Sequence, residues 1–334
     1  MRRLPAEFEE QSFIQVVFPH SKSDWNDYLE EAQKNFIAII NAIAMYQQCL
    51  VVCDDLSSVK AHFNSHTNIH FVQVPTNDTW ARDSSAITVY EDGKALLLDF
   101  SFTAWGGKFD AHLDNEMSQR LSTVYDAPMK CMDFILEGGA IESNGKGTLL
   151  ITSECVFNPN RNSRLSKDES LDVLKEAFGV SKIISLDHGY LKGDDTDSHI
   201  DTLARFTDES TIVYLKCDDK EDEHYGALQA MEEQLKGFTD QDSKPFRLVP
   251  LPFTRAIYDE DERLPATYAN FLIMNEAVLV PIYNDANDQE ALKILQEVFP
   301  SRKIIPVDCS TLIRQHGSLH CVTMQFPYKA NLKK

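Results

Sequence analysis

A hairpin motif that recurs along the chain constrains the fold more than any other feature. Two strand-like runs joined by a tight turn occur four times, at residues 85–100, 139–152, 202–215 and 268–282. Asp92-Gly93 and Asn144-Gly145 in the first two turns are typical of β-hairpin loops, and the other two turns are weaker signals. Amphipathic helices and further strand-like runs lie between the hairpins. The pattern predicts a repeated ββαβ unit.

Polar residues that could carry chemistry stand at matching places in these units. Asp83 and Glu137 precede the first two hairpins, His199 and Asp201 open the third, and Cys321 opens the last strand. The separations are 54 residues from Asp83 to Glu137, 62 from Glu137 to His199, and 122, twice 61, from His199 to Cys321. A period near 60 is typical of a repeat architecture. We expect His199 and Asp201 to point the same way on a strand.

The two ends of the chain each hold a strand-like run without a hairpin partner, residues 14–18 and 322–326. Pairing these runs would hide two sheet edges and close a ring. The sequence therefore predicts a single α/β domain over residues 1–334. Its expected form is a five-bladed, pseudo-symmetric α/β propeller in which the loops with the polar residues converge.

Composition narrows the classes of partner. The chain has 32 Lys and Arg against 52 Asp and Glu, a net charge of −20, which disfavours nucleic acid and anionic membranes and favours a small cation. The N-terminus lacks the apolar core of a signal peptide, and no apolar run is long enough to span a bilayer, so we expect a cytoplasmic protein.

Metal and disulfide frameworks are not expected. The seven cysteines include no C-x-x-C pair. His62, His66 and His70 are spaced four apart, but their polar surroundings are more typical of a helix end and loop than of a metal site.

The converging residues suit one kind of substrate. A thiol beside a histidine, Cys321 and His199, is typical of covalent attack on an electrophilic carbon. Three carboxylates would disfavour the oxyanion that forms on a carbonyl substrate, but they match the five N–H donors of a guanidinium. Trp80 and Trp105 could cover such a cation or its alkyl chain, or could simply belong to the core. Cys321 alone could likewise be a core residue.

Several blocks resemble one family, the agmatine deiminases, within the guanidine-modifying (pentein) superfamily that includes peptidyl-arginine deiminases. The blocks run in family order from LPAEFE at 4–9 to QFP at 325–327, with TWARDS at 79–84, AWGGK at 104–108, LEGGA at 136–140, NPNRN at 158–162, SHID at 198–201 and LHC at 319–321. The resemblance implies a five-fold α/β propeller, often dimeric, without metal or organic cofactor. Ser198 stands where the family usually has Gly, and Met324 where it usually has Gln.

The resemblance also implies the reaction, hydrolysis of agmatine to N-carbamoylputrescine and ammonia, a step of putrescine and polyamine synthesis. Cys321 would be the nucleophile that forms a thiouronium intermediate and His199 the acid and base, while Glu137, Asp83 and Asp201 would hold the guanidinium. Because these acids should raise the thiol pKa of the empty site, we expect the substrate's charge to help ionise its own nucleophile.

Three alternatives stay open: an arginine or peptidyl-arginine deiminase, an amidinotransferase, and a non-catalytic ring-shaped binding protein. A free amino acid substrate would need a cation for its carboxylate, and the candidates are Arg82, Arg205 and Arg255. The complete set of thiol, histidine and acids favours an enzyme over a binding protein.

Overall fold

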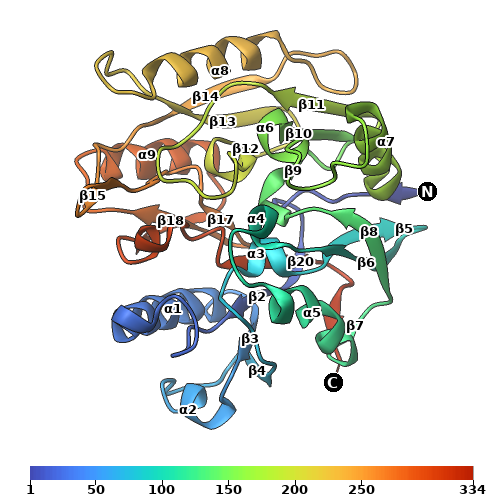
Figure 1. Cartoon of the computed structure of the whole chain (residues 1–334), viewed down its shortest axis with the longest axis vertical. Coiled ribbons are helices and arrows are strands. Elements are labelled where there is room, and N and C mark those ends of the chain that lie inside the picture. The colour runs from blue at the N-terminus through green and yellow to red at the C-terminus, as the bar shows by residue number, and fades with distance from the viewer. Residues whose placement is uncertain (334) are drawn as a thin grey trace.

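The computed structural model describes residues 1–333, which form a mixed α/β structure built on five sheets of three or four strands (Figure 1). The first sheet has the order β1 (Arg2–Arg3), β5 (Ile87–Glu91), β6 (Lys94–Ser101), β8 (Met129–Ile135). The next three are β9 (Ile141–Ser143), β10 (Thr148–Thr152), β11 (Lys182–Leu186); β12 (Ala204–Phe206), β13 (Thr211–Lys216), β14 (Arg247–Pro252); and β17 (Leu272–Ile273), β18 (Ala277–Ile282), β19 (Lys303–Asp308). The fifth is β20 (Thr323–Pro327), β2 (Gln11–Val17), β3 (Gln48–Cys53), β4 (Ile69–Gln73).

All five sheets share one strand pattern. An antiparallel pair is followed by a parallel strand, as in β9–β10–β11 and β12–β13–β14. The four predicted hairpins are confirmed as the pairs β5–β6, β9–β10, β12–β13 and β17–β18. Two small sheets, β7 (Tyr125–Asp126) with β21 (Asn331–Leu332) and β15 (Tyr258–Asp259) with β16 (Glu262–Arg263), complete the strands of residues 1–333.

In each of the five sheets, a helix connects the antiparallel pair to the parallel strand that follows it, because parallel strands need a long crossover. These helices are α1 (Leu29–Ala44), α5 (His112–Arg120), α7 (Lys167–Phe178), α8 (Tyr225–Gly237) and α9 (Asp288–Val298). In α7, Ser166 and Glu169 form a capping box, and Gly179 ends the helix in the left-handed conformation that glycine adopts easily. Among residues 1–333, no helix combines the length and the apolar character needed to cross a membrane.

The pairing expected between the ends of the chain is present. β2 runs antiparallel to β20, with Gln15 opposite Met324 and Val16 opposite Thr323. The rings of Phe13 and Phe326 stack with their centroids 4.3 Å apart. Because β2 also pairs with β3, β20 from the C-terminal part of the chain completes a sheet whose other strands come from residues 11–73.

Short helical turns lie where the site residues are found. They are α3 (Ala81–Ser84), α4 (Ala104–Gly107), α6 (Ser153–Val156) and the 3₁₀ turns η3 (Gly138–Ala140) and η4 (Ile200–Thr202). α2 (Leu56–Lys60) and the 3₁₀ turns η1 (Asn26–Tyr28), η2 (Leu121–Thr123) and η5 (Leu312–Gln315) complete the helical elements of this range. The expectation that His199 and Asp201 share a strand is wrong, because Asp201 lies within η4 and His199 directly before it.

Candidate active site

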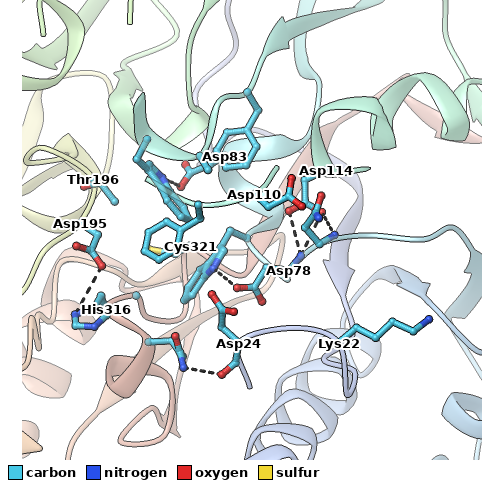
Figure 2. A pocket seen from close by; sticks show the side chains of 18 residues that line it. Lys22, Asp24, Asp78, Asp83, Asp110, Asp114, Asp195, Thr196, His316 and Cys321 are labelled. Atoms are coloured by element: carbon cyan, nitrogen blue, oxygen red, sulfur yellow. Dashed lines mark hydrogen bonds and ion pairs between the residues drawn. The ribbon is translucent and has the colours of Figure 1, made fainter. Parts of the chain in front are cut away.

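A cavity of about 320 Å³ opens beside Cys321 (Figure 2). Trp80, Asp83, Trp105 and Cys321 line it, which are four of the seven site residues predicted from the sequence. The other three, Glu137, His199 and Asp201, are buried next to Asp83 and do not line the cavity.

Asp83 connects the cavity wall to the buried residues. Its Oδ1 accepts a hydrogen bond from the backbone N–H of Gly139 at 3.0 Å and lies 3.7 Å from Nδ1 of His199. A Cβ atom at Gly139 would lie 2.6 Å from His199 Nδ1, 3.0 Å from Asp83 Oδ1 and 3.1 Å from Asp201 Oδ2. Three predicted site residues therefore surround one point, and only glycine fits there.

The pKa values of this group reflect burial and mutual charge. Burial raises the pKa of Asp83 to about 6, although the nearby His199 acts against it, and the carboxylates of Asp201 and Glu137 add to the rise. Burial acts to lower the pKa of His199, but Asp83, Cys155 and Glu137 outweigh it and hold that pKa well above its ordinary value.

Glu137 is held by a cation that the sequence did not single out. Its Oε1 accepts a hydrogen bond from Nε of Arg161 at 2.9 Å, and its Oε2 lies 3.9 Å from Nε2 of His199. Burial acts to raise the pKa of Glu137, but His199 and Arg161 outweigh it, so the net shift is downward. Glu137 is therefore a carboxylate at neutral pH.

Asp201 belongs to a buried chain of charged residues. Nδ1 of His320 lies 2.7 Å from Asp201 Oδ2, and Nε2 of His320 lies 2.7 Å from Glu7 Oε2. Ionised carboxylates only accept hydrogen bonds, so the ring serves both when both its nitrogens carry a proton. His320 outweighs the effect of burial and keeps the pKa of Asp201 below its ordinary value.

The thiol of Cys321 is held by a neutral acceptor. Oδ1 of Asn270 accepts from the thiol at 3.4 Å and from the backbone N–H groups of Cys321 at 3.3 Å and His320 at 2.9 Å. Burial, followed by the negative charges of Asp201 and Asp83, holds the pKa of Cys321 well above its ordinary value. The sequence led us to expect that the acids raise the thiol pKa in the empty site, and this shift of the Cys321 pKa is upward as well.

Aspartates make the cavity acidic (Figure 2). Besides Asp83, the lining contains Asp24, Asp78, Asp110, Asp114 and Asp195. Asp78 Oδ2 accepts a hydrogen bond from Nε1 of Trp80 at 3.0 Å, whereas its buried Oδ1 has no hydrogen-bond partner within residues 1–333. Burial, with the charges of Asp24 and Asp114, raises the pKa of Asp78 to about 7. The cavity therefore offers an unsatisfied carboxylate to a cationic ligand.

Trp105 reaches Asp83 from an unusual backbone turn. Ala104, Trp105, Gly106 and Gly107 have φ values of 48°, 54°, 90° and 81°. The left-handed conformation costs about 1–2 kcal/mol for each residue that is not glycine. The turn directs Nε1 of Trp105 to Oδ2 of Asp83, 3.0 Å away, and places its ring edge-on to Trp80 at 6.1 Å.

The two departures from the family pattern differ in their surroundings. Ser198 has φ 66°, a conformation that favours glycine, and its N–H donates to Asp194 Oδ2 at 2.7 Å. The serine therefore keeps the turn before His199 at the expense of backbone strain. Met324 is buried in the core beside β2 and lies outside the cavity lining.

The three arginines proposed as carboxylate partners are engaged elsewhere. Arg205 is fully buried and pairs with Glu7 and Glu142, Arg82 donates to Gln325, and Arg255 pairs with Asp285. In the part of the chain that the structure describes, none of the three lines the cavity. Sequence reasoning missed five residues that support the site. Four of them lie in or next to the blocks that resemble the family: Glu7, Asp78, Arg161 and His320. The fifth, Asn270, has no local sequence signal.

Comparison with known proteins identifies the family. The family model of Porphyromonas-type peptidyl-arginine deiminases matches residues 3–327. The chain belongs to this family. A solved structure named as the putative arginine deiminase from Porphyromonas gingivalis is 46% identical, with full coverage of both chains and a TM-score of 0.96.

Two further proteins similar to this chain are named as agmatine deiminases. A C. jejuni agmatine deiminase, a cysteine-to-serine variant solved with substrate bound, is 43% identical over 98% of this chain and 96% of that chain, with a TM-score of 0.93. A putative agmatine deiminase of Marinomonas sp. is 32% identical over 99% of this chain and 96% of its own length.

Proposed function

We propose that the protein hydrolyses agmatine to N-carbamoylputrescine and ammonia. The observation that carries the proposal is the buried group of Asp83, Glu137 and Asp201 around His199, beside the thiol of Cys321. Carboxylate oxygens match the planar N–H donors of a guanidinium, and Asp83 presents its carboxylate to the cavity. The relatives named as agmatine deiminases, one of them with substrate bound, support the same substrate.

Cys321 is the nucleophile in this proposal. The guanidinium enters between Asp83, Glu137 and Asp201, and its positive charge lowers the thiol pKa that the same acids raise in the empty site. The thiolate then attacks the guanidinium carbon and forms a C–S bond.

His199 serves as acid and then as base. Its raised pKa makes it an imidazolium at neutral pH, and it donates this proton to the amine that departs as ammonia. The neutral imidazole next takes a proton from the water that attacks the thiouronium carbon. Breakage of the C–S bond frees the ureido product and returns the thiolate.

The acidic cavity supports agmatine over arginine. Agmatine carries an ammonium at the end away from its guanidinium, and Asp78 offers a buried oxygen without a partner. Arginine would bring a carboxylate into the same cavity, and an unpaired, partly desolvated carboxylate costs several kcal/mol. Lys22 also lines the cavity, but it pairs with Asp54 at 3.1 Å.

Cys321→Ser tests the proposal. The variant should bind agmatine and keep its melting temperature while ammonia release falls below detection, because a hydroxyl lacks thiolate character. Ammonia release is measured with agmatine, arginine and a blocked arginine peptide. Comparable turnover by the variant would remove Cys321 from the mechanism, and wild-type preference for either arginine substrate would replace agmatine in the proposal.

The shared strand pattern supports a proposal for the architecture. We infer that the chain forms one five-bladed α/β propeller of ββαβ units, with each sheet as a blade and the β2–β20 pair joining the ends. A cytoplasmic location and a homodimer stay predictions. Light scattering coupled to gel filtration tests the dimer.

A further inference from the structure

A second thiol lies beside His199. Cys155, on the short helix α6, is buried, and its Sγ lies within 4.8 Å of a nitrogen of His199 and a carboxylate oxygen of Glu137. The proposed reaction gives Cys155 no role. All three side chains are at most 1% exposed, so the cluster is shielded from bulk water.

One atom of the cluster is left without a partner. Nε2 of His199 is buried and makes no hydrogen bond with any residue of 1–333, and Oε2 of Glu137, 3.9 Å away, is beyond hydrogen-bond distance. A buried polar nitrogen without a hydrogen-bond partner is uncommon in folded proteins, and a bound ligand would supply the missing partner. Arg161 holds the other oxygen of Glu137 at 2.9 Å and so leaves Oε2 directed to the cluster.

We propose that Glu137, Cys155 and His199 form a zinc site. Thiolate, imidazole and carboxylate are the ligands that Zn²⁺ takes in proteins, whereas Mg²⁺ and Ca²⁺ take oxygen ligands. Tetrahedral zinc places such ligand atoms about 3.4–3.6 Å apart. The three atoms, within 4.8 Å of one another, need to approach by roughly 1 Å, which side-chain rotation provides.

Charge and proton balance fit a divalent ion. Asp83 and Asp201 lie beside His199 and add negative charge to the surroundings of the cluster. Zinc binding displaces one proton from the Cys155 thiol and one from the His199 imidazolium, forms one Zn–S and one Zn–N bond, and adds a bond to Glu137 Oε2. The fourth position is left to water.

Zinc at this site inhibits the enzyme. It engages His199, the acid and base of the proposed reaction, and a carboxylate that holds the guanidinium, so zinc and agmatine exclude each other. This consequence rests on the proposed function, whereas the binding of zinc does not.

The experiment measures binding apart from activity. Zn²⁺ is titrated calorimetrically, and Co²⁺ is added as a probe because its thiolate complexes have a charge-transfer absorption band. Cys321→Ser, which the proposed mechanism makes inactive, should bind one metal ion per chain and show the band. Cys155→Ala should lose the band and bind zinc at least about tenfold more weakly, because loss of even an outer-shell partner of a metal ligand costs about 10- to 100-fold in affinity. Cys131→Ala removes an exposed thiol and should match the wild type.

Two outcomes would overturn the proposal. Loss of binding in Cys321→Ser with retention in Cys155→Ala would place the metal on the nucleophile. Equal binding in all variants would show adventitious association only. Melting curves confirm that each variant folds, and Cys155→Ser replaces the alanine variant if the latter does not. In the wild type, zinc should raise the apparent KM for agmatine, and Cys155→Ala, compared with its own zinc-free rate, should resist it.

Discussion

Asp78→Asn separates recognition of the substrate's ammonium from the chemistry at Cys321. Burial and the charges of Asp24 and Asp114 raise the pKa of Asp78 from 3.8 to about 7. At about 1.4 kcal/mol per pKa unit, a rise of about three units corresponds to ~4 kcal/mol of resistance to ionisation of the Asp78 carboxyl group. An ammonium at the unpaired Oδ1 relieves most of this resistance. The amide of asparagine cannot gain from it.

The expected loss in kcat/KM for agmatine is about a hundred- to a thousandfold, since each 1.4 kcal/mol is tenfold. Steady-state ammonia release measures it. Butylguanidine, which has the guanidinium but no ammonium, should be hydrolysed equally by wild type and variant, and this shows that the chemistry is intact. Asp110→Asn is the matched control, because Asp110 lines the same cavity but is exposed and contacts His112 at 2.8 Å.

Two results would refute this reasoning. A change of less than about threefold with agmatine would mean that the ammonium lies elsewhere, since threefold is only ~0.6 kcal/mol. An equal loss with butylguanidine would mean that Asp78 supports the fold of the site and not the distal amine. In the wild type we also expect agmatine to exceed arginine by a factor on the order of a thousand, and Asp78→Asn should narrow this ratio.

Three other perturbations test the framework. Glu7→Gln removes the buried carboxylate that contacts His320, whose other ring nitrogen contacts Asp201. The substitution should lower the free energy of unfolding by about 3–5 kcal/mol and raise the KM for agmatine. An unchanged melting temperature would contradict this. The pKa values of Asp78 and Asp114 are both raised to about 7, so the folded protein binds protons that the unfolded chain releases near pH 4, and stability should fall as pH rises from about 4 to 7. Differential scanning fluorimetry at pH 5.5 and 7.5 should show a smaller fall in the double Asn variant. Truncation from Leu319 onward removes the strand that pairs with β2 and should unfold the protein; a truncated chain with the wild-type melting temperature would exclude this dependence.

The hairpins could be predicted because their signals are local. Turn residues such as Asn144-Gly145 between β-rich runs specify a pairing by themselves. The pairing of β2 with β20 could be inferred because both strands lacked a neighbour. The conformation before His199 could not, since Asp197 and Ser198 both adopt positive φ, and the side chain of Asp194 holds that turn.

The supporting residues of the site were missed for a different reason. Glu7 contacts His320 across 313 residues, and Asn270 reaches Cys321 across 51. No spacing rule connects such pairs, because they meet only when separate sheets come together. The period near 60 residues identified groups that we propose contact the substrate. It gave no information about the residues that hold those groups in position.

Burial and the charges of Asp201 and Asp83 raise the pKa of the Cys321 thiol, and this shift bears on the design of covalent probes. A thiol that keeps its proton in the empty cavity reacts slowly with neutral electrophiles such as iodoacetamide, because alkylation needs the thiolate. A haloamidine carries its own positive charge into the same carboxylates and creates the thiolate as it binds. The rate of Cys321 labelling should therefore depend more on the charge of the reagent than on its intrinsic reactivity. A cationic reagent would label Cys321 selectively in the presence of the exposed thiol of Cys131.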